Sequence, residues 1–307
     1  MNRYHRILVI VDPTAATQPA ISKGAILAQS LGARLELLVC DTRAAREARL
    51  AAESIHGAIP YNAKALVESI AQPLRARGLD VTTEVAWTES LDAGLVEHAC
   101  RASANLVLKD THHHSLAQRT FLSNTDWQLI RGCRAPLLLT KDRVWSRSPC
   151  VLAAIDPQHV NDKPAHLDQQ ILERARSLAN ALGGDLHIVH AYLPASIAAN
   201  ATATSLGAVI VSDQDLRQER EFRMQSIRQI SASFGVADSH VHLELGGPTA
   251  VLPSVAEAIQ ADVIVMGAVS RRGLRRVLMG STAEDVLERL PCDAFVVKPE
   301  NFAELSA

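Results

Sequence analysis

Apolar and polar positions along the chain follow two alternating patterns. Short uninterrupted apolar runs, of which residues 7–11 (ILVIV) are the first, predict buried β-strands. Longer segments between these runs, such as residues 62–77, repeat apolar residues at spacings of three and four, which predicts amphipathic helices. Parallel strands that are buried on both faces read as continuous apolar runs, and helices connect them. The pattern therefore predicts an α/β fold.

The order of these elements occurs twice. Residues 6–41 and 150–192 each contain a strand that ends in Asp-Pro, then a helix, a glycine and a second apolar strand. We expect the two glycines, Gly32 and Gly183, to lie just past the helix ends, where a positive φ favours glycine. Both halves of the chain thus begin with the same strand-helix-strand unit.

The ends of the two halves also correspond. Residues 105–141 align without a gap with residues 262–298, so that each residue lies 157 positions before its counterpart. With the elements in between, each half alternates five strands with four helices, and the polar stretch 142–149 suits a linker. We predict two tandem Rossmann-like domains, residues 1–145 and 146–307, each a five-stranded parallel sheet with helices on both faces.

Charge and composition disfavour several classes of function. The 31 Lys and Arg residues nearly balance the 33 Asp and Glu residues, so the chain lacks the positive field that concentrates nucleic acid. No apolar run is long enough to span a bilayer and the first residues do not read as a signal peptide, which predicts a cytoplasmic protein. The five cysteines are scattered without C-x-x-C spacing, which suits a reducing compartment.

The second half carries a loop suited to bind an anion. In an open parallel sheet, ligands bind beyond the carboxyl ends of the strands, and residues 267–282 follow such an end. The loop brings Gly280 and Ser281 to a helix start, where free N–H groups, a glycine and a hydroxyl make a phosphate cradle. Four arginines between residues 271 and 276 add positive charge. The alternative is an ordinary turn and helix cap beside a solvated arginine face.

This loop resembles a family signature. Gly267, Ser270 and Gly280 with its following Ser stand at the spacing of the universal stress protein motif, which reads Gly, two residues, Gly, nine residues, then Gly-Ser or Gly-Thr. Residues 125–131 (TDWQLIR) and 280–299 (GSTAEDVLERLPCDAFVVKP) make the whole chain similar to the tandem, E-type branch of that family. The resemblance implies the adenine nucleotide alpha hydrolase-like form of the Rossmann fold, and ATP as ligand, with Mg²⁺ as its companion ion.

The resemblance also implies where the nucleoside of ATP lies. Carried over position by position, it places Asp156 near the nucleoside and gives Ala154 and Ala191 the role of lining the adenine slot through their backbone. Met266 and Gly267 would lie under the ribose and the phosphates. These residues all stand at or next to predicted strand ends.

The remaining positions concern the phosphates. The resemblance implies that Gly280, Ser281 and Thr282 grip them. Ser270 stands where the family has a second glycine; if that residue needs a positive φ, a side chain costs roughly 1–2 kcal/mol. A penalty of that size weakens affinity by about tenfold.

The first half departs from the motif at every aligned position. It has Asp110, His113, Ser123 and Asn124 there, so no glycine remains and a carboxylate takes the place of the first one. A carboxylate repels a triphosphate. We expect that the first half has lost the nucleotide site.

Histidines provide a second candidate chemistry. Asp110 with His112, His113 and His114 offers imidazole and carboxylate groups that suit zinc. Consecutive residues rarely all point at one ion, so a polar loop with exposed histidines is the alternative.

Four further histidines lie on predicted strands of the second half. His240 and His242 are two apart, which indicates one face of a strand, and we interpret that face as solvated or partly buried. His187 and His190 fall on opposite faces of another strand, which argues against a joint role.

The combined expectation is a stress-response binding and signalling protein that holds ATP in its C-terminal domain and is no dedicated enzyme. A slow ATPase is an alternative. Another is a binder of an apolar or lipid-like molecule, through the uncharged segment 194–211 and the altered first-half site. The resemblance implies that the two halves pair through their last strands about a pseudo-twofold axis. Further homodimerisation stays open, and the protein partner is not readable from the sequence.

Overall fold

A computed structural model of the chain gives the architecture. The residues that it describes are 4–15, 17–43, 46–47, 62–111, 122–158, 166–194, 212–267 and 281–299.

The first half folds as the apolar pattern predicts. Its elements are β1 (Arg6–Val11), α1 (Pro19–Leu31), β2 (Arg34–Thr42), α3 (Ala63–Ala76), β3 (Val81–Thr88), α4 (Leu91–Arg101), β4 (Leu106–Asp110), α5 (Asn124–Gly132) and β5 (Leu137–Thr140).

The second half repeats this order, with one short 3₁₀ helix, η1, added before its third strand. Its elements are β6 (Cys150–Ala154), α6 (Leu167–Leu182), β7 (Asp185–Tyr192), α8 (Asp213–Ser233), η1 (Asp238–His240), β8 (Val241–Leu245), α9 (Pro248–Ala258), β9 (Val263–Gly267), α10 (Ser281–Arg289) and β10 (Asp293–Val297). Among the described helices, none is long and apolar enough to cross a membrane.

Helix ends follow the signals in the sequence. Gly32 and Gly183 end α1 and α6 with φ of 60° and 63°, and the N–H of each glycine bonds back to the helix carbonyls, as predicted. At the other ends, the side chains of Asn62 and Ser212 accept hydrogen bonds from the first turns of α3 and α8. Local residue choice therefore sets the limits of these four helices.

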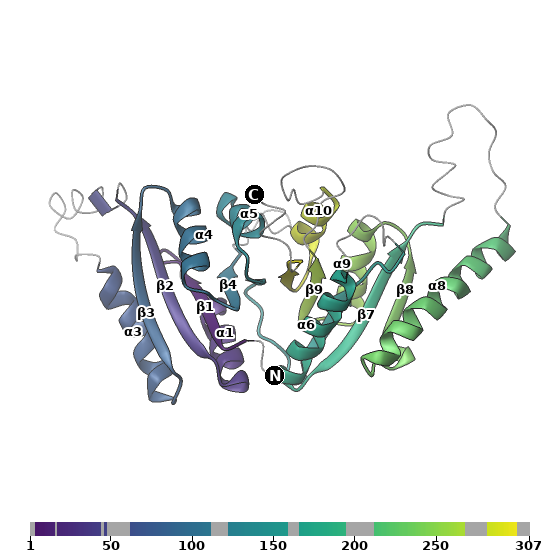
Figure 1. Cartoon of the computed structure of the whole chain (residues 1–307), viewed down its shortest axis with the longest axis horizontal. Coiled ribbons are helices and arrows are strands. Elements are labelled where there is room, and N and C mark those ends of the chain that lie inside the picture. Colours follow the sequence, from purple (N-terminus) through teal and green to yellow (C-terminus); the bar gives the residue numbers. More distant parts are fainter. Residues whose placement is uncertain are drawn as a thin grey trace, which may run out of the picture.

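The strands of the described residues form one ten-stranded sheet, in the order β3-β2-β1-β4-β5-β10-β9-β6-β7-β8. Neighbours within each half are parallel, whereas β5 and β10 are antiparallel and pair Leu138 with Phe295. The two halves consequently lie side by side, the first in purple to teal and the second in teal to yellow (Figure 1). An antiparallel pair of equivalent strands is the arrangement that a twofold axis between the halves produces. The fold class and the pairing of last strands are confirmed.

Each face of the sheet is covered by one hydrophobic cluster that spans both halves. Helices α1, α3, α6 and α8 pack on one face, and α4, α5, α9 and α10 pack on the other. The first cluster includes Val9 and Val265, and the second includes Leu8 and Ile264. Because the halves share their core, the limits 1–145 and 146–307 stay a prediction.

A buried ion pair lies where the halves join. Lys23 Nζ of α1 is 2.8 Å from Asp293 Oδ2 of β10, and these side chains are 3% and 1% exposed. The Asp293 carboxylate also accepts hydrogen bonds from the backbone N–H of Lys141 and from Trp145 Nε1, each at 2.8 Å. Lys23 donates in addition to the Lys141 carbonyl. One carboxylate of the second half thus holds both α1 and the connection after β5.

Replacement of Lys23 by methionine is expected to destabilise the whole chain. It leaves the Asp293 carboxylate buried without its cation, and breaking a buried pair in this way costs about 3–5 kcal/mol. Urea unfolding followed by circular dichroism measures the loss. The control is Arg34→Met, which removes the exposed pair with Asp80 and leaves stability essentially unchanged, because water screens that pair. Equal stability of Lys23→Met and the unaltered chain would show that the buried pair contributes nothing.

Candidate functional site

The strand order has a switch point in each half. β1 lies between β2 and β4, and β6 lies between β7 and β9. The connecting helices therefore cover opposite faces of the sheet on the two sides of β1 and of β6, and parallel sheets bind ligands at such points. In the second half Ala154 ends β6, Asp156 follows it, and Met266 and Gly267 end the neighbouring β9, while Ala191 lies one residue before the end of β7. These five predicted residues are brought to one edge of the sheet.

The two switch points differ in the size of the side chains beside them. Ala154 and Ala191 pack against the cluster under α9 and α10, and Met266 belongs to it. The first half has a larger side chain at one of the equivalent strand positions and a charged one at another. Ile10 stands opposite Lys109 in the β1–β4 pairing, in the places of Ala154 and Met266. The second half therefore offers the smaller residue at its central strand end.

A buried histidine supports the loop that carries Asp156. His190 is 2% exposed, and its Nδ1 lies 3.1 Å from the Ile155 carbonyl oxygen. A carbonyl only accepts, so Nδ1 carries the proton and Nε2 accepts from Arg223 Nη1 at 3.4 Å. Arg223 is itself held by Glu219 at 2.6 Å. The Asp156 side chain is 34% exposed and is partly in contact with solvent. His190 and Arg223 hold the strand end next to it from inside the fold.

The last residue of β4 in the first half and the last residue of β9 in the second half are equivalent in position but differ in role. At Gly267 an added Cβ would lie 2.7 Å from Leu167 Cδ2, at the start of α6. In the first half Asp110 occupies the equivalent place, and its Oδ1 accepts hydrogen bonds from Ala20 N at the start of α1 (2.7 Å) and from Thr140 Oγ1 (2.5 Å). A carboxylate of the chain itself therefore occupies the anion-binding end of α1.

Burial dominates the electrostatics of Asp110. The side chain is 6% exposed, and its Oδ2 has no hydrogen-bond partner within the described residues. Burial raises the pKa of Asp110, although the Thr140 hydroxyl and the Ala20 N–H act in the opposite direction. The sequence prediction that a carboxylate faces phosphates here is refined, because this carboxylate caps a helix.

Two further carboxylates surround the start of α5. Asp126 Oδ2 accepts from the backbone N–H of Ser123 at 2.7 Å, and its Oδ1 lies 2.7 Å from Lys109 Nζ. Asp92 accepts from Asn124 Nδ2 at 2.6 Å and also from the Thr125 hydroxyl. The start of α5, which aligns with the start of α10, therefore has two carboxylates and one lysine around it.

The second half has neutral residues at all three of these acidic positions. Thr249, Gly267 and Ala283 stand 157 residues after Asp92, Asp110 and Asp126. The alignment of the halves identifies Asp110, but the contribution of Asp92 and Asp126 becomes visible only when α4 and α5 lie together. The contrast in charge therefore extends beyond the sequence motif.

The phosphate loop itself is only partly described. α10 begins at Ser281, so Ser281 and Thr282 are its first two residues, in the helix's first turn. Ser270 and Gly280 lie outside the described residues, as does the Ser281 side chain. Glu284, which the sequence pairs with Ser281 in a capping box, forms an ion pair with Arg131 of α5 at 3.1 Å.

Comparison with known proteins explains the repeat. A model of the Universal stress protein family matches residues 3–141 and again residues 160–298. The chain belongs to the universal stress protein family. The tandem arrangement that the sequence predicts is confirmed.

Known universal stress proteins resemble the chain over its full length. Universal stress protein E of Escherichia coli K12 is 27% identical over 98% of this chain and 96% of its own. The homologue from Haemophilus influenzae is 26% identical over 97% and 98% of the two chains. The crystal structure of a universal stress protein from Pseudomonas aeruginosa matches with a TM-score of 0.77, at 27% identity, over 98% and 96%. The expected similarity to the E-type branch is confirmed.

The predicted zinc site of this universal stress protein lies mostly beyond the described part of the chain. His112, His113 and His114 are outside it, and Asp110 is buried against α1. Within the described ranges, no group of three or more His, Cys, Asp or Glu side chains is placed to hold a metal ion. The zinc site stays a prediction.

A second group of histidines gathers at the far strands of the sheet. His240 lies in η1, one residue before β8, which corrects the expectation that it shares a strand with His242. The His240 ring nevertheless stacks on His187 of β7 with centroids 3.9 Å apart, and the His242 ring lies nearly parallel to that of His187 with centroids 5.3 Å apart. His190 lies on the opposite face, as predicted. Burial lowers the pKa of His187 to about 4, with a further lowering by the two neighbouring histidines.

The cap formed by Asp110 can be tested with two variants of this universal stress protein. Asp110→Ala leaves the buried Ala20 N–H without its acceptor and should lower the free energy of unfolding by about 1–3 kcal/mol. Asp110→Asn keeps an accepting oxygen, removes the buried charge and should be the more stable variant in urea unfolding at pH 7. Equal stability of the two variants would show that the carboxyl does not cap α1.

The raised pKa of Asp110 also predicts how the free energy of unfolding changes with pH in the same experiment. A carboxyl whose pKa is raised by folding contributes most stability below its ordinary value of 3.8 and loses that contribution as pH rises through its folded-state pKa. The unaltered chain should therefore lose stability relative to Asp110→Asn as the pH increases above 3.8.

Proposed function

We propose that this universal stress protein binds ATP in its second half and acts as a stress-response binding and signalling protein. The contrast between two equivalent sheet edges carries the proposal. In the first half, three carboxylates stand at the helix starts where a phosphate would bind; in the second, their places are neutral. Because phosphates are polyanions, the second edge suits them better than the first.

The edge also suits the nucleoside. Ala154 and Ala191 keep the strand ends small, which leaves their backbone accessible to a flat purine ring. Asp156 is partly exposed beside them, and a carboxylate accepts hydrogen bonds from ribose hydroxyls. His190 and Arg223 support this loop from the sheet side.

Two features of the second half suit the phosphates of ATP. One is a strand end without a side chain, and the other is the start of α10. Gly267 has no side chain, and the contact that a Cβ would make with Leu167 indicates how closely the backbone packs there. Ser281 and Thr282 open α10, whose first N–H groups lack intrahelical partners. With Gly280 before them and Ser270 in the loop, they complete the proposed phosphate contacts. Mg²⁺ would accompany ATP as the counter-ion of its phosphates.

Restoration of the missing glycine tests this proposal. If the family's second glycine position requires a positive φ, Ser270→Gly should tighten ATP binding by about tenfold, because a side chain there costs roughly 1–2 kcal/mol. Isothermal titration of Mg-ATP into the full chain measures the affinity. The matched control is His113→Gly, which changes the equivalent position of the first half and should leave the affinity unaltered.

Gly280→Val provides the opposite test, because a branched side chain blocks close approach of a phosphate. Binding should be lost in this variant. The proposal is contradicted if Ser270→Gly brings no gain and Gly280→Val brings no loss. Phosphate release measured on the same proteins tests the slow-ATPase alternative; release that Gly280→Val leaves unchanged comes from a contaminating enzyme.

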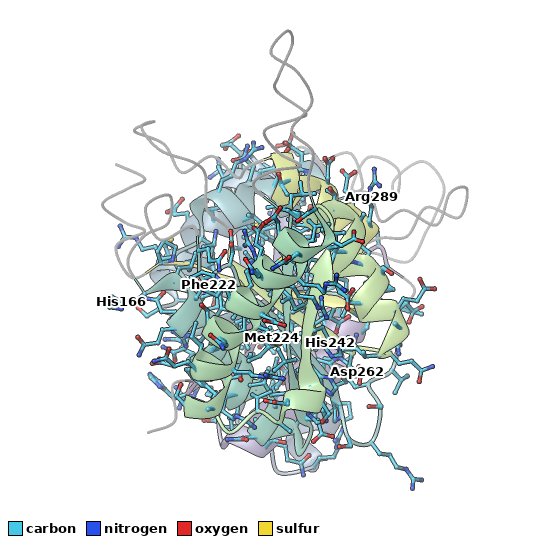
Figure 2. The ribbon with its side chains drawn as sticks, turned by 90° about the vertical axis from the view of Figure 1, so that its right-hand side faces the viewer. His166, Phe222, Met224, His242, Asp262 and Arg289 are labelled. Carbon is cyan, nitrogen blue, oxygen red and sulfur yellow. The ribbon has the colours of Figure 1, made fainter. Side chains whose placement is uncertain are left out.

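The sequence places the apolar-ligand alternative on the uncharged segment 194–211 and the altered first-half site, and all of that segment beyond Pro194 lies outside the described residues. Exposed apolar side chains of the second half bear on the same alternative. Leu193 after β7, Leu245 at the end of β8 and Phe222 on α8 are 51%, 55% and 64% exposed. Figure 2, which views the molecule from the α8 end, labels Phe222 on that helix. Large apolar side chains at such exposure are typical of binding surfaces when they lie together.

Mass spectrometry of the native chain separates the two ligand classes. Purified protein that carries ATP supports the nucleotide proposal. A lipid-like mass that disappears in a Phe222→Ser and Leu245→Ser double variant would instead establish the apolar ligand. The control is Val144→Ser, which removes an apolar side chain of 90% exposure distant from α8 along the chain.

A further inference from the structure

The histidine group at β7 and β8 has a geometry that the proposed nucleotide function does not use. His187 Nδ1 lies 3.0 Å from His242 Nε2, and the two ring planes are 7° apart. Both residues are half-buried, so one side of the pair is open to water. Figure 2 shows His242 on the β8 side of the molecule, where the sheet ends.

The nitrogen separation is that of an N–H···N hydrogen bond, and it is also close to the distance between two neighbouring nitrogen ligands of one metal ion. Imidazole nitrogens lie about 2.0–2.1 Å from a bound first-row metal ion. Two nitrogens 3.0 Å apart then subtend roughly 90–97° at the ion. That is close to the right angle between neighbouring ligands in square-planar or octahedral coordination, whereas a tetrahedral ion needs about 3.3–3.4 Å.

We infer that His187 and His242 form a two-histidine binding site for a divalent transition-metal ion that favours right-angled coordination, such as Ni²⁺ or Cu²⁺. Imidazole is a preferred ligand of these ions. Water fills the other coordination positions, because the described residues offer no third donor in place. The metal ion joins the edge strand β8 to β7.

The chain without metal holds the two nitrogens together by a hydrogen bond. One imidazole donates its N–H to the other, and the tautomer decides which one is the donor. Metal binding moves that proton to the other nitrogen of the same ring, so both lone pairs become available and no proton is released. The rings must also turn so that the lone pairs converge on one point.

His240 supports the pair from the side. Its ring stacks on His187 at a centroid distance of 3.9 Å and an interplanar angle of 12°. Stacking limits the motion of His187, but it directs the His240 nitrogens alongside those of His187 and not toward them. We therefore assign His240 a positioning role. Imidazole binds a metal ion in its neutral form, which is the form that an N–H···N bond between the two rings contains.

Isothermal titration with NiCl₂ on the full chain tests the site. The unaltered chain should bind Ni²⁺ with a component that weakens by at least about tenfold in His187→Gln and equally in His242→Gln, since even an outer-shell change costs 10–100-fold in affinity. His240→Gln should retain binding with a smaller loss. Circular dichroism and the thermal midpoint without metal verify that each variant is folded.

The matched control is a triple variant in which His112, His113 and His114 become Gln. It removes the sequence-predicted metal loop and should leave the Ni²⁺ component in place. Electron paramagnetic resonance of bound Cu²⁺ adds a direct readout, with two nitrogen ligands in the unaltered chain and one in His242→Gln. Titrations of His187→Gln and His242→Gln that equal the unaltered chain overturn the proposal, as does loss of binding in the triple variant alone.

Discussion

The Asp293 carboxylate is the constraint on which the joint between the halves depends. It is almost completely buried and is satisfied by a cation, a backbone N–H and an indole N–H that all come from outside its own half or strand. If these partners are removed or shifted, nothing compensates the desolvation cost of burying the Asp293 charge. The antiparallel register of β5 and β10 is thereby tied to the position of α1. One sheet and two shared hydrophobic clusters follow from that joint.

The two halves share one fold but contribute different side-chain contacts to the joint between them. Counted back from the glycines that end α1 and α6, the equivalent of Lys23 is Arg174, whose guanidinium lies over the Tyr4 ring at 5.2 Å. Tyr4 in turn meets Phe295 of β10 edge-on. An ion pair on one side of the axis thus corresponds to a cation–π contact on the other. Fusion into one chain permits this difference, because each half always meets the same partner.

Local patterns predict much of this protein and fail where distant segments meet. Continuous apolar runs and helical spacing give the ten strands and eight α-helices of the described residues in order but miss η1, and Gly32 and Gly183 mark helix ends because φ there is a local property. Pairing of the last strands came from family resemblance and not from the pattern. The sequence also separates His187 from His240 and His242, because their meeting depends on the register of β7 against β8. It identifies Asp110 as a charge but not as a cap for α1, which lies 90 residues away in sequence.

The two sheet edges differ in which groups accept hydrogen bonds from the free N–H groups at the helix starts. A helix start between strand ends exposes N–H groups that need an acceptor in every state of the protein. The first half supplies such acceptors through its own carboxylates, since Asp110 accepts from the Ala20 N–H and Asp126 from the Ser123 N–H. The second half has Gly267 and Ala283 at these two places, so it lacks both of these carboxylates. An ion pair between Glu284 of α10 and Arg131 of α5 connects the two edges across the joint.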